Sequence, residues 1–224
     1  GDRWQEIERL HREELANFAA YNLQDCVLVE RIFAKLKLIE LQQTRVDLTG
    51  IPMSQPGGSV ASFENLYLPR LHRSGWVGPA WSEDKFVPSP GGFVMNAVPC
   101  LYKNVLVFDF KSLYPSIIRT FFVDPLARVV AQALAQDEGL VPGYRGASFQ
   151  RQFAILPELV AELAQSRETA KRDGNDILSY AIKIIMNSFY GVLGSSVCRF
   201  YHAELASSIT MRGHELLGRS KQWI

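Results

Sequence analysis

The stretch VLVFDFKSLYPSII, residues 105–118, decides how the rest of the chain is interpreted. It opens with four apolar residues typical of a strand, which lead directly to Asp109. Pro115 stands where proline is tolerated, in the first turn of a helix. The stretch therefore predicts a strand, a turn and a helix, with a carboxylate at the strand's carboxyl end. That position is common for metal-binding or catalytic side chains, although a lone aspartate there more often caps a turn.

A pair of helices is predicted further along the chain. The first begins at Pro157 and runs through PELVAELAQSRETAKR, and the second runs from Asp176 to about Tyr190. Because only Asp-Gly-Asn separates them, the two helices must pack antiparallel.

This hairpin gathers polar side chains on one surface. Arg167 and Lys171 share a face of the first helix, and Lys183, Asn187 and Tyr190 share a face of the second. Folding at the turn places Arg167 beside Lys183, which suits a polyanion such as a triphosphate. Charge spacing alone more often means a solvated helical face. The aromatic ring beside a glycine, at Tyr190, favours a site, because it suits stacking on a base.

The composition is that of an ordinary globular protein, with 47% apolar and 21% charged residues. The net charge of +1 does not indicate a nucleic-acid partner, so any such partner must be held by local positive charge. Cys26, Cys100 and Cys198 are too scattered for a disulfide framework or a zinc site, and they favour a reducing, cytoplasmic compartment. No apolar run reaches the roughly 18 residues of a membrane helix, and we expect no membrane contact.

The remaining segments indicate how the chain is organised. The first forty residues show helical periodicity, a loop rich in proline and glycine follows at 49–58, and a short helix is expected from Val60 to Leu71. The turn-rich stretch 74–92 marks a linker. Residues 93–99, like 105–110, read as strands, so the predicted fold class is α/β (α+β).

Together these segments resemble the family B DNA polymerases. DFKSLYPSII is similar to their motif A, Asp-x-x-Ser-Leu-Tyr-Pro-Ser-Ile, and KIIMNSFYG to their motif B, Lys-x3-Asn-Ser-x-Tyr-Gly. Upstream, YNLQD matches the Tyr-x3-Asp motif of the family's 3′–5′ exonuclease. The likeness runs end to end, and the whole chain resembles the bacterial polymerase II branch, notably in PGGFVM, DFKSLYPSIIRTF, KIIMNSFYGVLG and LASSITMRGH.

The resemblance implies roles at a polymerase site for the residues around motif A. Asp109 is expected to bind both catalytic Mg2+ ions, with help from the carbonyl of Phe110. The backbones of Ser112 and Leu113 would meet the triphosphate. Tyr114 would lie under the sugar of the incoming nucleotide, where its ring would exclude a 2′-hydroxyl.

The resemblance also assigns the hairpin. Arg167 and Lys171 match the family's phosphate-binding pair on the fingers, and Lys183 and Asn187 match the motif B pair. Tyr190 is expected near the nascent base pair.

Three glycines are expected to let the template strand approach. They are Gly191, after motif B, and Gly91 with Gly92, which resemble the family's Gly-Gly motif. Ser89 stands where that motif usually has a tyrosine, which puts part of the template contact in doubt.

Two residues match the exonuclease, and two motifs are missing. Asp25 would be a metal ligand, and Tyr21 would orient the attacking water. No Asp-x-Asp, which carries the second metal-binding aspartate of the polymerase in motif C, and no Asp-x-Glu, the first exonuclease motif, occurs in the sequence. We therefore expect an internal part of a polymerase, inactive by itself.

The expected layout is a partial palm sheet, a helical-hairpin fingers subdomain and an N-terminal helical segment. Residues 1–48 would be the last helices of the exonuclease domain and 49–98 a linker with the start of the palm. The palm with motif A would cover 99–150, the fingers hairpin 151–194, and the return to the palm 195–224.

The resemblance implies a template-directed DNA polymerase that adds dNTPs to a primer by two-metal catalysis, in DNA repair and replication restart. Its expected partners are primer–template DNA, dNTP and a sliding clamp that binds elsewhere, and its expected location is the cytoplasm, at the nucleoid. The alternatives are a non-catalytic nucleic-acid-binding module and a structural domain derived from a polymerase. A P-loop ATPase is excluded, because no Gly-x4-Gly-Lys-Ser/Thr occurs.

Overall fold

The structure is a computed structural model that describes residues 2–54, 58–81, 86–96, 98–133 and 139–223. The chain forms two compact units, Gly1–Gln43 and Thr44–Ile224, which are described separately. In the described part of the chain, no helix combines the length and the apolar character needed to cross a membrane.

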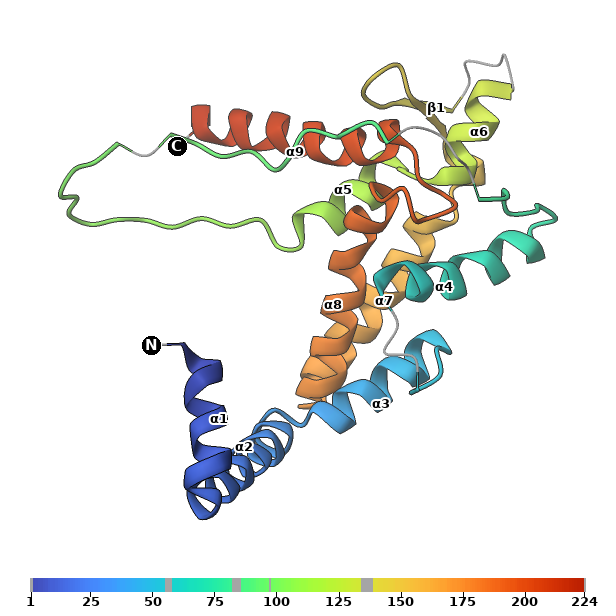
Figure 1. Cartoon of the computed structure of the whole chain (residues 1–224). Coiled ribbons are helices and arrows are strands. Elements are labelled where there is room, and N and C mark those ends of the chain that lie inside the picture. Colours follow the sequence, from blue (N-terminus) through green and yellow to red (C-terminus); the bar gives the residue numbers. More distant parts are fainter. Residues whose placement is uncertain (1, 55–57, 82–85, 97, 134–138, 224) are drawn as a thin grey trace. The chain divides into compact units, whose positions relative to one another are not determined.

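The first unit is helical, as the periodicity predicted. It contains α1 (Arg3–Glu13), α2 (Leu15–Leu36) and the start of α3 (Leu38–Thr49) (Figure 1). The side chain of Asp2 caps α1 by accepting a hydrogen bond from the N–H of Trp4 at 3.1 Å. Neither α1 nor α2 has a buried residue, so this unit has no packed core of its own along these helices.

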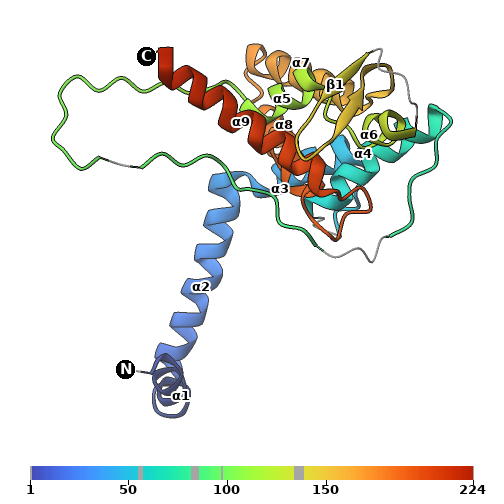
Figure 2. The same ribbon diagram turned by 90° about the horizontal axis from the view of Figure 1, so that it is seen from above.

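The second unit is mostly helical and holds a small sheet. Its elements are α4 (Ser59–Arg73), α5 (Leu113–Phe121), α6 (Pro125–Ala133), β1 (Leu140–Pro142), β2 (Ser148–Gln150), η1 (Arg151–Phe153), α7 (Leu156–Arg172), α8 (Asp176–Leu193) and α9 (Ala203–Trp223). The core of this unit lies where α4, α5 and α7 pack against α8, around aromatic side chains such as Phe63, Tyr67 and Phe189. α9 lies across α5 and packs against α8 (Figures 1 and 2).

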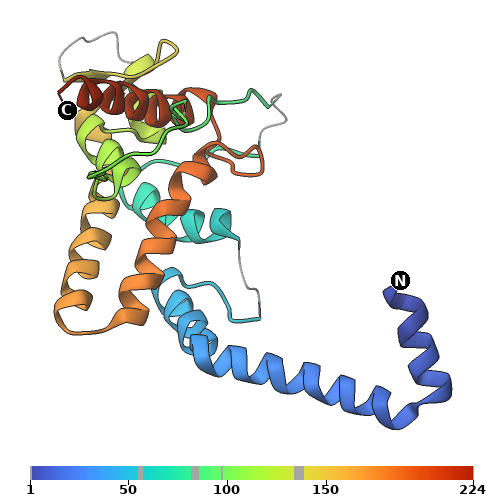
Figure 3. The same cartoon turned by 90° about the vertical axis from the view of Figure 1, so that its left-hand side faces the viewer.

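The predicted helical hairpin is confirmed. α7 and α8 run antiparallel, joined by a short turn (Figure 3). Gly174 makes that turn with φ of +70°, a conformation that side chains disfavour. Asn175 then caps α8, because its side-chain oxygen accepts a hydrogen bond from the N–H of Leu178 at 3.0 Å. Buried faces of the two helices, which include Leu163 and Ile182, hold them together.

The expected palm sheet is not formed by the predicted segments. The described residues of 93–99, which exclude Ala97, and those of 105–110 have no strand structure, and Leu106 and Val107 are 79% and 88% exposed. A strand is stable only against a hydrogen-bonded partner, and the described part of the chain provides none for them. The chain therefore mixes helix with one small antiparallel sheet, in which β1 pairs with β2 and Leu140 faces Gln150.

Candidate nucleotide-binding site

Asp109 enters the site just before the turn that leads into α5. Ser112 lies in the left-handed region with φ of 55°, which is uncommon for a residue with a side chain. Its carbonyl accepts a hydrogen bond from the N–H of Ser116 at 2.9 Å, and the hydroxyl of Ser116 donates to the carbonyl of Lys111 at 3.3 Å. These bonds hold the backbone after Asp109 against the first turn of α5.

A hollow of about 610 Å³ lies between this turn and the α7–α8 hairpin. It brings together all the residues predicted to bind the polymerase metal or the nucleotide, and also Tyr190. Its walls are formed by Asp109, Phe110, Lys111, Ser112, Leu113, Tyr114, Pro115, Arg167, Lys171, Lys183, Asn187 and Tyr190. Three segments that are distant in sequence therefore meet at one site, while the role of each residue stays a prediction.

The hairpin side of the hollow is positively charged. Arg167, Lys171 and Lys183 all reach it, and the Nε atom of Arg167 is buried without a hydrogen-bond partner in the described part of the chain. Glu168 balances part of this charge, because its carboxylate lies 3.1 Å from Nζ of Lys111 and 3.3 Å from Nζ of Lys171. Hydrogen bonds from Lys111 and then Lys171 lower the pKa of Glu168, which keeps it ionised. The excess of cations suits phosphate groups.

Two tyrosines form the aromatic wall of the hollow. The ring centroids of Tyr114 and Tyr190 are 4.8 Å apart, with the rings tilted. Burial raises the pKa of Tyr190, the nearby Tyr114 hydroxyl adds to that shift, and a hydrogen bond with Ser89 opposes it. Each ring offers a flat apolar face and a polar hydroxyl, which suits contact with a sugar or a base.

The predicted template glycines lie around the hollow. A Cβ added at Gly92 would lie 3.3 Å from the hydroxyl of Tyr114, and the carbonyl of Gly91 accepts a 2.8 Å hydrogen bond from Nε2 of His214. Gly191 lines a neighbouring hollow of about 360 Å³, which shares Tyr190 with the larger one.

The contribution of α9 was not predicted. The hydroxyl of Ser89 lies 3.3 Å from that of Ser207 and 3.4 Å from that of Thr210, and His214 holds the backbone at Gly91. α9 therefore fixes the Gly-Gly segment beside the tyrosines. The sequence LASSITMRGH carries these residues and marks the family likeness, but nothing in its spacing indicated this contact.

Magnesium fits the oxygen donors of the site only in part. The carboxylate of Asp109 and the carbonyl of Phe110 are the hard ligands that Mg2+ prefers. In the described part of the chain, no three His, Cys, Asp or Glu side chains gather where they would hold a metal ion. The residues present therefore supply a share of the ligands that two ions need.

The predicted exonuclease pair lies in the first unit. Tyr21 and Asp25 are one turn apart on α2, and both are exposed. The hydroxyl of Tyr21 accepts a 3.0 Å hydrogen bond from the guanidinium of Arg3, and this bond raises the pKa of Arg3. The structure thus places the two residues on the same helix face, and their roles stay predictions.

A buried carboxylate, Asp124, was missed by the sequence analysis. It accepts hydrogen bonds from the hydroxyl of Tyr67 at 3.0 Å and from the N–H groups of Ala127 at 2.7 Å, Leu156 at 2.8 Å and Ile155 at 3.1 Å. Burial raises its pKa to about 6 despite these bonds. Asp124 thereby ties α4 and α6 to the start of α7, and so positions the hairpin. An aspartate directly before a proline is a helix N-cap signal that would have found it.

The site combines a cationic helical hairpin with a turn that carries a carboxylate, as expected for an enzyme that binds nucleoside triphosphates. Residues 56–224 match the family profile described as DNA polymerase family B, and the chain belongs to that family.

The chain is similar in sequence to several DNA polymerases. The chain is 48% identical over 223 residues to DNA polymerase II of Escherichia coli (strain K12). The alignment covers 100% of this chain and 28% of that protein. It is 28% identical over 225 residues to the DNA polymerase of Thermococcus sp. (strain 9oN-7), over 92% of this chain and 28% of that protein. The chain thus spans less than a third of the length of these relatives.

A solved structure shares the fold. The family B DNA polymerase from the hyperthermophilic archaeon Pyrobaculum calidifontis aligns with a TM-score of 0.66 and 24% identity, over 85% of this chain and 27% of that chain.

Proposed function

We propose that this chain forms the nucleotide-binding half of the active site of a template-directed DNA polymerase. The observation that carries the proposal is the single hollow in which Asp109 and Tyr114 face three cations of the α7–α8 hairpin. Membership in DNA polymerase family B supports it.

The hairpin would bind the triphosphate of the incoming dNTP. Arg167 offers a planar fork to two phosphate oxygens, while Lys171 and Lys183 offer mobile point charges. Asn187, on the same face of α8 as Lys183, would donate a further hydrogen bond. Because negative charge moves onto the leaving phosphates as the primer 3′-oxygen attacks, these cations would stabilise the transition state as well as the bound nucleotide.

The turn before α5 would hold the reacting end of the nucleotide. Ser112 and Leu113 would meet the phosphates with their backbones, and Tyr114 would lie against the sugar and exclude a 2′-hydroxyl. Asp109 and the carbonyl of Phe110 would hold magnesium, which stabilises charge on the phosphates when it is bound.

The aromatic and glycine residues would face the DNA. Tyr190 would lie near the nascent base pair, and Gly191, Gly91 and Gly92 would let the template backbone approach. These assignments rest on the motif likeness. The position of Tyr190 in the wall of the hollow, of Gly191 in the neighbouring hollow and of Gly92 beside the hydroxyl of Tyr114 supports them.

The first unit would belong to a 3′–5′ exonuclease, with Asp25 as a metal ligand and Tyr21 orienting the attacking water. The whole protein would act in DNA repair and replication restart at the nucleoid, with primer–template DNA, dNTP and a sliding clamp as partners. Two-metal catalysis needs a second carboxylate, which we place outside this chain. The chain alone is therefore expected to bind dNTP without extending a primer.

The proposal is tested by titrating dTTP and Mg2+ into the chain by calorimetry. Lys183→Ala is expected to weaken binding roughly tenfold, because it removes a charge-assisted contact to phosphate. Lys35→Ala removes the same charge from α2 and should leave the affinity unchanged. A labelled primer–template in the same sample should stay unextended.

Two results would count against the proposal. Equal affinity in wild type and Lys183→Ala would remove the hairpin from the nucleotide site. Binding of DNA without any binding of dTTP would favour a non-catalytic nucleic-acid-binding module.

A further inference from the structure

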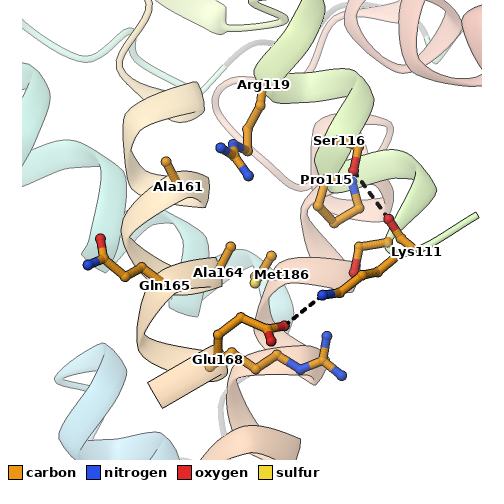
Figure 4. Close-up of a pocket in the computed structure, with 11 residues that line it drawn as sticks. Lys111, Pro115, Ser116, Arg119, Ala161, Ala164, Gln165, Glu168 and Met186 are labelled. Carbon is orange, nitrogen blue, oxygen red and sulfur yellow. Dashed lines mark hydrogen bonds and ion pairs between the residues drawn. The ribbon is translucent and has the colours of Figure 1, made fainter. Parts of the chain in front are cut away.

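A second hollow of about 440 Å³ adjoins the nucleotide pocket, between α5 and α7 (Figure 4). The two hollows share the walls formed by Lys111, Ser112, Pro115 and Arg167. The second one has further walls of its own, formed by Ser116, Arg119, Ala161, Ala164, Gln165, Glu168 and Met186. We call this second hollow the side hollow. It lies next to the nucleotide pocket, on the other side of the residues that line both.

Cations outnumber acids around the side hollow. The guanidinium of Arg119 points into it from α5 (Figure 4), and no hydrogen bond or ion pair to this group is found among the residues that the structure describes. Arg167 lines it too, and its buried Nε atom has no hydrogen-bond partner among the described residues. Lys111 also lines it and is paired with Glu168, the one acid among its lining residues. The balance of charge suits an anion.

The other residues that line the side hollow indicate which kind of anion it would bind. Asp109, Tyr114 and Tyr190 line the nucleotide pocket and are absent from the lining of the side hollow. Without them, this hollow has no ring for a base or a sugar. Its apolar wall includes Ala164 and Met186, and an apolar wall strengthens charge interactions by lowering the local dielectric. These features suit a bare phosphate anion with no nucleoside attached.

We propose that the side hollow binds inorganic pyrophosphate released by the proposed nucleotidyl transfer. The inference rests on that proposed function. In the reaction, the primer 3′-oxygen forms a bond to the α-phosphorus and loses its proton to solvent. The bond from the α-phosphorus to the bridging oxygen breaks, and that oxygen leaves with the electron pair as part of pyrophosphate. Lys111 and Arg167 line both hollows, so the product moves from one to the other without leaving both cations.

Glu168 sets how tightly the hollow holds its ligand. Its carboxylate pairs with Lys111 at 3.1 Å, so an anion that arrives in the side hollow must take its place at this amine. Lys171, which lies 3.3 Å from the same carboxylate, lines the nucleotide pocket and not the side hollow. Once pyrophosphate has left, Glu168 pairs with Lys111 again. The acid therefore weakens product binding and favours release.

The test is a titration of the full chain with inorganic pyrophosphate, followed by calorimetry, beside a titration with dTTP. Arg119→Gln is expected to weaken pyrophosphate binding about fivefold and to leave dTTP affinity within about twofold. Glu168→Gln is expected to tighten pyrophosphate binding by about threefold. Glu162→Gln is the matched control, because it removes the same charge from α7 where the partner is Arg70 at 2.7 Å, and it should change neither affinity.

Two outcomes overturn the inference. One is pyrophosphate affinity that Arg119→Gln leaves unchanged, or no pyrophosphate binding by a chain that binds dTTP. The other is an equal effect of Glu168→Gln and Glu162→Gln. Failure of the proposed function is separate, since it shows as dTTP binding that is absent or independent of Lys183.

Discussion

The carboxylate of Asp124 is fully buried, and its surroundings make it sensitive to pH. Its hydrogen bonds from Tyr67 and three backbone N–H groups favour the ionised form, but burial outweighs them and raises the pKa to about 6 from 3.8. Between these two values the folded chain binds more protons than the unfolded chain. The free energy of unfolding that Asp124 contributes therefore falls as pH rises through this interval.

We expect this loss to be about 3 kcal/mol between roughly pH 4 and pH 7. Asp124→Asn cannot titrate, so the difference in unfolding free energy between wild type and variant should fall by that amount over the same interval. Urea denaturation at several pH values measures it. A difference that does not vary with pH would show that the carboxylate keeps its ordinary pKa.

At the scale of elements, the α7–α8 hairpin contains two glycines whose backbone conformations differ. Gly174 has φ of +70°, whereas Gly191 lies inside α8 with open space around its Cβ position. Gly174→Ala should lower the free energy of unfolding by roughly 1 kcal/mol, because the left-handed conformation disfavours a side chain. Gly191→Ala should raise it by about 0.5–1 kcal/mol, because glycine is a poor helix former.

Thermal or denaturant unfolding of the two variants measures this pair. Both variants replace glycine with alanine in the same hairpin. Opposite changes in the free energy of unfolding would therefore be due to the backbone conformation at each position. If Gly174→Ala did not lower the free energy of unfolding, the turn at Gly174 would not have the left-handed geometry, and a destabilised Gly191→Ala would contradict the prediction for α8.

The sequence predicted the helices well and the strands poorly, for a physical reason. Helical hydrogen bonds form within one segment, so apolar periodicity, Pro157 and the Asp-Gly-Asn turn indicate α7 and α8 without knowledge of the rest of the fold. Strand hydrogen bonds need a partner, and 93–99 and 105–110 find none in the described part of the chain. The β1–β2 hairpin was missed because its strands are only three residues long.

The sequence predicted those residues of the candidate site that belong to motifs A and B. Asp109 and Lys183 belong to motifs, and their meeting at one hollow was predicted. Arg119 lies outside motif A, and its place at the side hollow depends on how α5 and α7 pack. The Asp-Pro step marks Asp124 as a helix N-cap, but its burial and its bonds to the start of α7 depend on how α6 and α7 pack. Such contacts arise from tertiary packing, which spacing along the chain does not encode.

At the scale of the whole molecule, the second unit separates two tasks. The α7–α8 hairpin and the turn before α5 form a hollow that would hold the nucleotide, while the metal site has one predicted carboxylate, Asp109. We therefore expect this chain to bind the nucleotide without carrying out the reaction. The exposed apolar segment 105–108, directly before Asp109, marks a surface that is expected to pair with further strands of the polymerase.

The most direct measurement of the central claim is a crystal structure of the chain with dTTP and Mg2+ bound. We expect the triphosphate to lie between Arg167, Lys171 and Lys183, with the sugar against Tyr114 and the α-phosphate toward Asp109. A nucleotide bound elsewhere on the second unit, with these side chains still turned toward an empty hollow, would contradict it.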